Sequence, residues 1–185
     1  MKRSLLTLSI LLCFAVVCHA QGQGLRDYPV SEAAEERFTE VIGRMQELSG
    51  VASGIANAAG TGTISREQQE ALTSIAHMSE VISSILDGMK VMLQAERMHG
   101  MDSQFNAGAL STISGYIAEN SQTMERTLQE WRGVLTGYRD DQLVYQQASQ
   151  HMANLQEAYE TMLLITSQIS DTQARLAGRT DANTR

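Results

Sequence analysis

Hydrophobic residues recur at alternating steps of four and three positions along four stretches of the chain. A spacing near 3.5 residues places such side chains on one face of an α-helix. The first stretch follows Ser31, a candidate N-cap with acidic residues close behind it. Its stripe consists of Ala34, Phe38, Val41, Met45, Leu48, Ala52 and Ile55. We therefore expect an amphipathic helix that begins after Ser31 and ends before the break at Ala58.

A break separates this helix from the next one. The segment Ala58–Ile64 (AAGTGTI) carries Gly60 and Gly62, and Ser65 and Gln68 then have the spacing of a capping box. The second stripe consists of Ala71, Ile75, Met78, Ile82, Ile85, Met89 and Met92. We expect this helix to end near Gly100, because glycine is the usual residue just past a helix end.

Two more helices follow a loop or weak turn at residues 101–108 (MDSQFNAG). The third stripe consists of Leu110, Ile113, Ile117, Met124, Leu128, Trp131 and Leu135, with Asn120 and Ser121 interrupting it and Gly137 closing it. Asp140 or Asp141 then caps the fourth helix, expected over Gln142–Ala177. Its stripe consists of Tyr145, Ala148, Met152, Leu155, Tyr159, Met162, Thr166 and Ile169.

Four amphipathic stretches with short connections predict an all-α fold, an elongated antiparallel bundle of three to four long helices. Gly88 and Gly115 leave open whether two helices are broken, since glycine costs about 1 kcal/mol relative to alanine inside a helix. The bundle domain covers residues 31–178. An extended lead-in at 21–30 precedes it, and a flexible polar tail at 179–185 follows it.

Residues 1–20 (MKRSLLTLSILLCFAVVCHA) have the features of a secretory signal peptide. Two basic residues precede a short apolar run, and Cys18-His19-Ala20 offers a cleavage site after Ala20. The expected location is therefore periplasmic or secreted, with no membrane span after cleavage. An uncleaved N-terminal anchor and a lipoprotein acylated at Cys18 are the alternatives.

The charge and the cysteine content of the chain exclude several classes of function. The formal charge is −7, and removal of residues 1–20 takes away two basic residues and no acid, which makes it −9. An acidic chain without clustered Lys or Arg is a poor nucleic-acid binder. Both cysteines, Cys13 and Cys18, lie in the signal segment. The remaining chain therefore has no disulfide, thiol nucleophile or thiolate metal site.

The sequence contains no catalytic or cofactor motif, so we expect no enzyme activity, no cofactor and no metal site. His77 and Glu80 have helical spacing, but one such pair does not make a di-metal site. We expect His77, His99 and His151 to be surface residues. Trp131 is expected to be a packing anchor, and Met89 and Met92 are expected in the core.

Two segments are candidate interaction sites. Met98 and Met101 lie at the end of the second helix, with Phe105 in the following turn, and methionine adapts to irregular partners. Gly60 and Gly62 lie in the Gly- and Ala-rich break, where small side chains permit close approach. A frayed helix end with a loop is the alternative explanation of that break.

The overall layout resembles the periplasmic helical components of type IV secretion and conjugation machines, the minor-pilin-like and TrbJ-like proteins. The resemblance lies in the signal segment and in residues 133–169 (GVLTGYRDDQLVYQQASQHMANLQEAYETMLLITSQI), where a long helix follows the polar turn 138–141. It implies a structural or adhesive role at the cell envelope, with pilus or secretion-channel subunits as partners. It implies no catalytic residues.

The sequence thus predicts an exported, non-enzymatic helical interaction protein of the cell envelope, with self-association also possible because heptad stripes serve both bundles and coiled coils. Two alternatives stay open. One is a periplasmic bundle that holds a small apolar ligand between its helices. The other is an enzyme whose site carries no known motif.

Overall fold

The computed structural model describes the backbone at residues 24–25, 28–58, 62, 64–102 and 105–182. Side chains are described at residues 28–58, 62, 64–100 and 107–175. The expected signal peptide and Gly60 lie outside the described residues.

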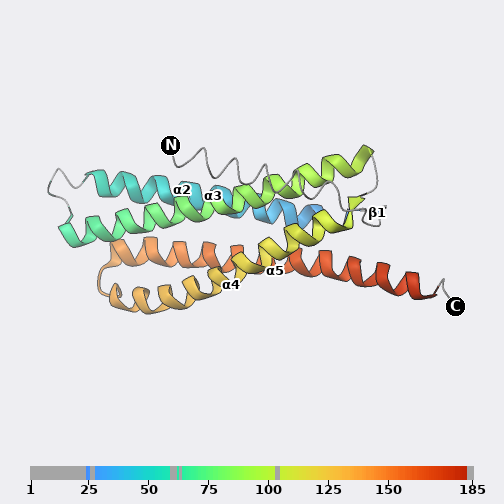
Figure 1. Cartoon of the computed structure of the whole chain (residues 1–185). Coiled ribbons are helices and arrows are strands. Elements are labelled where there is room, and N and C mark those ends of the chain that lie inside the picture. The colour runs from blue at the N-terminus through green and yellow to red at the C-terminus, as the bar shows by residue number, and fades with distance from the viewer. Residues whose placement is uncertain (1–23, 26–27, 59–61, 63, 103–104, 183–185) are drawn as a thin grey trace, which may run out of the picture.

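Four long helices form an elongated antiparallel bundle, which confirms the predicted all-α fold (Figure 1). They are α2 (Glu32–Asn57), α3 (Arg66–Asp102), α4 (Ala107–Gly137) and α5 (Gln142–Ala182). Two short strands, β1 (Gly24–Leu25) and β2 (Phe105–Asn106), pair antiparallel, with Leu25 opposite Phe105. This pairing joins the lead-in to the connection between α3 and α4.

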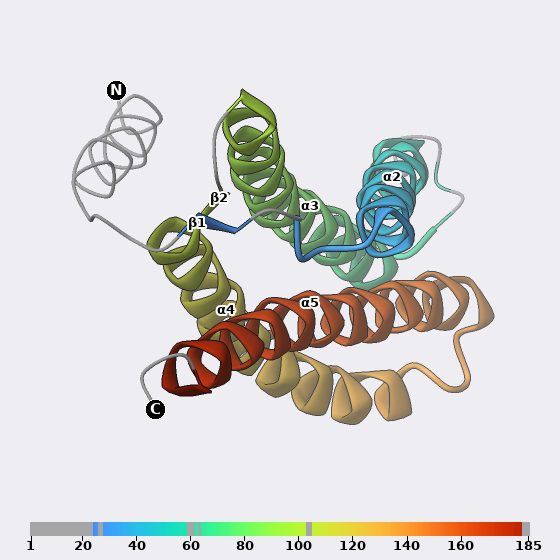
Figure 2. The ribbon, with the colours of Figure 1, turned by 90° about the vertical axis from the view of Figure 1, so that its right-hand side faces the viewer.

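The helices pack as two hairpins, α2 with α3 and α4 with α5. Contacts between α2 and α5 join the hairpins, whereas α3 and α4 contact each other much less. Figure 2 views the bundle from the end at which β1 lies between α3 and α4. The bundle is therefore least closed along its α3–α4 side.

Polar caps fix three of the helix starts as the sequence predicts. Ser31 Oγ accepts a hydrogen bond from the Ala34 amide at 3.3 Å. Ser65 and Gln68 form the capping box, with Ser65 Oγ accepting from the Gln68 amide at 3.1 Å and the Ser65 amide donating to Gln68 Oε1 at 2.8 Å. Asp141 Oδ1 accepts from the backbone amide at the start of α5, 3.2 Å away.

Several predicted helix ends and breaks are wrong. α3 continues through Gly100, α4 is unbroken at Asn120 and Ser121, and α5 extends five residues past Ala177. The polar pair does not interrupt α4 because its side chains donate to carbonyls of the same helix. Asn120 Nδ2 donates to a carbonyl four residues back at 2.9 Å, and Ser121 Oγ to one three residues back at 2.7 Å. The question left open for the two glycines is also answered, because Gly88 and Gly115 both lie inside uninterrupted helices.

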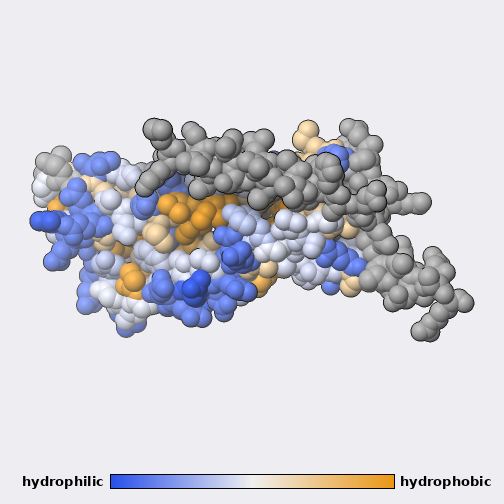
Figure 3. Space-filling view, viewed as in Figure 1, coloured by the Kyte–Doolittle hydropathy of each residue, from blue (hydrophilic) through white to orange (hydrophobic). Residues whose placement is uncertain are grey.

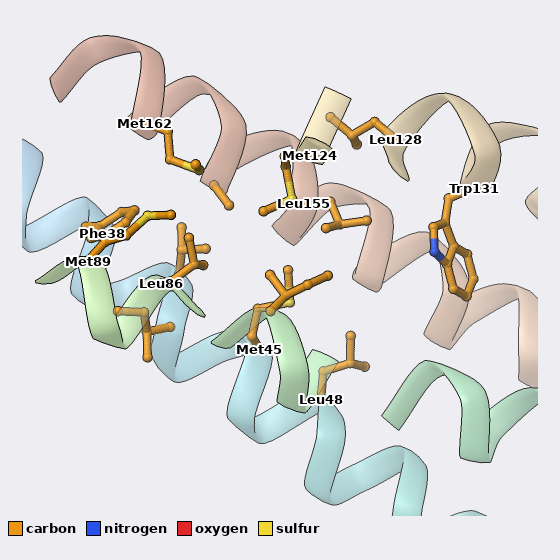
Figure 4. Close-up of a cluster of buried hydrophobic side chains, with 14 of the residues drawn as sticks. Phe38, Met45, Leu48, Leu86, Met89, Met124, Leu128, Trp131, Leu155 and Met162 are labelled. Carbon is orange, nitrogen blue, oxygen red and sulfur yellow. The ribbon is translucent and has the colours of Figure 1, made fainter. Parts of the chain in front are cut away.

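A single hydrophobic core runs along the bundle and receives side chains from all four helices. Figure 4 shows part of it, with side chains of the four helices pointing toward one another. The largest fully buried members are Phe38, Met45, Leu48, Leu72, Ile75, Leu86, Met89, Leu93, Leu110, Ile117, Leu155 and Met162. Trp131 is 8% exposed and packs in this core, as predicted.

The predicted stripes of α3 and α5 are partly wrong. Ile85 is 36% exposed and Tyr145 is 37% exposed, and Met78 and Met92 are only half-buried. Small polar residues, including Ser79, are buried on α3 instead. A pattern of apolar residues misses such positions because a small hydroxyl can be buried where two helices approach closely. An apolar row of α3 is therefore left at the edge of the core.

Two glycine substitutions should have opposite effects on stability. Gly62, in the α2–α3 connection, has φ +74°, a conformation that other residues adopt with strain. Gly88 lies inside α3, and a Cβ there would meet nothing within 4 Å. We expect Gly62→Ala to lower the free energy of unfolding by about 1 kcal/mol and Gly88→Ala to raise it by about the same. Urea unfolding of both variants tests this, and equal signs would contradict it.

Candidate functional site

The predicted interaction residues do not form one surface. Met98 is 71% exposed near the end of α3, whereas Gly62 is exposed before the start of α3. At 1.5 Å per residue, these two positions are about 50 Å apart along α3. The side chains of Met101 and Phe105 lie outside the described side chains. Met98 and Gly62 would therefore belong to separate contact surfaces.

The structure instead shows three adjoining hollows along the α3–α4 side. They occupy roughly 340, 440 and 610 Å³ and share the side chain of Tyr138, at the end of α4. The apolar part of their lining is Ala71, Ile75 and Met78 from α3, Trp131 and Val134 from α4, and Leu143 from α5. We call the surface formed by these hollows, together with the adjoining apolar row Met78, Val81 and Ile85 of α3, the α3–α4 groove.

An apolar row on α3 extends the groove toward the middle of the bundle. Val81 and Ile85 follow Met78 by three and seven positions, so the three side chains lie on one face of the helix. Val81 is 41% exposed and Ile85 is 36% exposed, and Val134 of α4, which lines a hollow together with Met78, is 41% exposed. Figure 3 shows hydrophobic surface over the middle of α3. A large exposed apolar patch usually marks an interaction site.

The charged residues that line the hollows are all acidic: Glu67, Glu70, Glu130, Asp140 and Asp141. Arg66 lies beside them, with Nε 2.8 Å from Glu70 Oε1, but its side chain is 90% exposed. Such a surface pair is weak and can exchange for another cation. The groove thus combines an apolar floor with a negative rim.

A buried polar cluster lies beneath Trp131. His151 of α5 is fully buried, so its prediction as a surface histidine is wrong. Its Nδ1 lies 2.8 Å from Ser79 Oγ on α3, and its ring centroid lies 4.6 Å from that of Trp131. Burial lowers the pKa of His151 to about 4, because the charged imidazolium loses its hydration. His151 is therefore neutral at pH 7.

The Ser79–His151 pair has the residue types of a nucleophile and a base, but neither side chain is exposed. A substrate could not reach Ser79 Oγ without opening the bundle. The pair is better explained as an interhelical hydrogen bond inside the core. Gln147 and Asn154 are also buried on α5, one turn to either side of His151. The three residues at steps of four and three were the sequence signal for a buried polar face, which hydrophobicity alone did not reveal.

A second polar cluster fastens the lead-in to α2 and α3. Arg97 binds Glu35 at 2.6 Å and Glu32 at 3.0 Å, and its guanidinium lies 5.7 Å from the ring centroid of Tyr28. Tyr28 donates its hydroxyl hydrogen to the Leu93 carbonyl at 3.0 Å. Burial, with Glu35 nearby, raises the pKa of Tyr28. These contacts tie α2, α3 and the lead-in together.

Two further kinds of site are not found within the described residues. No three His, Cys, Asp or Glu side chains there come together as a metal site would require. No described helix has both the length and the hydropathy needed to cross a membrane. The α3–α4 groove is therefore the strongest candidate site in the described part of the molecule.

No family model matches this chain. No curated protein matches it, and no solved structure does either.

Proposed function

We propose that this protein is an exported, non-enzymatic interaction protein of the cell envelope that binds partner proteins through the α3–α4 groove. The observation that carries the proposal is the apolar row on α3, with Met78 half-buried and Val81 and Ile85 exposed, beside three hollows. On α2 and α4 the corresponding apolar stripes are buried or half-buried against the other helices. Here the heptad stripe of α3 extends past its neighbours and offers the same kind of packing to a second protein.

The narrower proposal is a conjugation or type IV secretion accessory, or a minor pilus component. Its support is the layout of a signal-like segment followed by long Gln- and Met-containing helices, together with the polar turn before α5. The partners would be pilus or secretion-channel subunits.

Site-specific crosslinking in the native envelope tests the groove as the docking surface. A photoreactive amino acid at Val81 should give crosslinked adducts, because that side chain is exposed on the apolar row. The same group at Gln46, exposed on α2, should give few or none. The adducts are separated by size and identified by mass spectrometry.

The proteins found in the adducts distinguish the proposed functions from each other. Pilus or channel subunits linked only through Val81 would support both levels of the proposal. Equal labelling at Val81 and Gln46 would contradict the groove as a specific surface. A dimer of this protein would indicate self-association instead, and other envelope proteins would contradict only the narrower proposal.

The second candidate function is binding of a small apolar ligand. The observation in its favour is the hollow of roughly 340 Å³ against Trp131, Val134 and Tyr138, which falls in the size range of small-molecule sites. Native mass spectrometry of protein purified from its own cell would show a retained ligand. A spectrum that shows the mass of the chain alone, with no ligand, would count against this candidate.

A further inference from the structure

We infer that the partner segment for the α3–α4 groove is a basic amphipathic helix, whose apolar face packs on the groove floor and whose Lys or Arg side chains contact the acidic rim. This inference rests on the proposed function and specifies the chemistry of the partner. It follows from the shape of the groove and from the sign of the charge along it.

The length of the groove fits a helical segment of moderate size. Its α3 wall runs from Glu67 to Ile85, which is about 27 Å at 1.5 Å per residue, or five helical turns. The apolar positions Ala71, Met78 and Ile85 recur every seven residues along that wall. A partner helix with its own seven-residue apolar repeat would match this spacing over its whole length.

Charge selects a basic partner over an acidic one. The hollows are lined by acidic residues of α3, of α4 and of the α4–α5 turn, and by no basic residue in the part of the chain that the structure describes. Glu67 and Glu130 lie on opposite walls, so cations on either side of a docked helix would meet a carboxylate. Complementary charge at a rim mainly sets partner choice and the rate of association.

The same charge argues against a second copy of this chain as the occupant. The chain carries a formal charge of −7, with 21 acidic and 14 basic residues. Two copies docked by their grooves would bring two acidic rims together, and like charges at an interface are unfavourable.

Model peptides test the inference with the folded protein. The first, the Lys peptide, is an 18-residue helical peptide of Leu and Lys with Leu repeating at heptad spacing. The second, the Glu peptide, has the same sequence with Glu in place of every Lys. Both lack tryptophan. Trp131 is the only tryptophan in the chain and lines a hollow, so its emission reports occupancy of the groove directly. Anisotropy of a labelled peptide gives the Kd.

We expect the Lys peptide to bind and to change Trp131 emission, with affinity falling as salt rises, and the Glu peptide to bind at least tenfold more weakly. The variant Glu67→Gln/Glu130→Gln/Asp140→Asn should weaken binding of the Lys peptide about tenfold. The matched control is Glu36→Gln/Glu40→Gln/Glu47→Gln. It removes three exposed acids of α2, changes the net charge equally, and should have little effect.

Three negative outcomes of this experiment have different meanings. Equal binding of both peptides, lost on Val81→Asp/Ile85→Asp, would overturn the basic partner but keep the groove as a docking surface. Binding of the Lys peptide that weakens equally in both triple variants, with Trp131 emission unchanged, would be general charge attraction and would overturn the inference. No binding of either peptide would overturn it as well. Circular dichroism of each variant confirms that it is folded.

Discussion

Phe38→Ala is expected to lower the free energy of unfolding by about 3–5 kcal/mol, the largest effect of any single substitution considered for this bundle. Phe38 is 1% exposed on α2, and its ring lies in the buried cluster that also contains Met89 of α3 and Met162 of α5 (Figure 4). Truncation removes the transfer free energy of the ring and leaves a cavity among three helices. Since small domains are stable by about 5–15 kcal/mol, the variant should unfold at much lower urea concentration.

Val51→Ala is the matched control, because Val51 lies on the same helix but is 45% exposed. Its effect should stay below about 0.5 kcal/mol. Urea titration followed by circular dichroism measures both variants. A loss below 1 kcal/mol for Phe38→Ala would show that α2 does not pack on α3 and α5 as described.

Acid should destabilise the bundle through His151. Its pKa is about 4 in the folded state, and an exposed histidine has a pKa of about 6.5. Between these values the unfolded state binds more protons than the folded state, so the free energy of unfolding falls as pH falls. The contribution of His151 is fully present above pH 6.5 and is lost as pH drops to about 4, a change of about 3 kcal/mol.

Carboxylates titrate in part of the same range, so the measurement is a difference between variants. Ser79→Ala/His151→Leu removes both hydrogen-bonding groups together and leaves no orphan partner. Its free energy of unfolding should depend on pH by about 3 kcal/mol less than that of the wild type. His77→Gln changes an exposed histidine and should keep the wild-type slope. An unchanged slope in the double variant would mean that His151 is solvated in the folded protein.

We expect the two parts of the groove to respond differently to mutation. Trp131 and Met78 contribute to the core as well as to the groove, so truncating them would cost stability and confuse a binding test. Val81 and Ile85 project further out, and polar substitutions there should disturb docking with less cost to folding. These two residues are therefore the better positions for separating function from stability.

The sequence alone determined the fold class and most of the helix starts. Ser31, the Ser65–Gln68 pair and Asp141 could be recognised because capping needs particular side chains at fixed local spacing. The apolar stripes of α2 and α4 were also largely correct, because their members are buried or half-buried, although Ser114 and Ser121 are buried on α4 as well. The helix ends predicted at Gly100 and Ala177 differ from the observed ends by two and five residues, because helix ends carry weaker local signals than capped starts.

Only the tertiary structure decided which face of α3 is buried and which is left open. Ser79 and His151 are 72 residues apart, and each looks like a surface residue until the bundle brings them within 2.8 Å. Conversely, Ile85 fits the heptad stripe yet is 36% exposed, because α4 does not pack closely along α3. The local pattern shows which side chains of a helix can be buried. Whether they are buried depends on how closely a neighbouring helix packs on them in the shared core. The groove remains because α4 makes few contacts with α3.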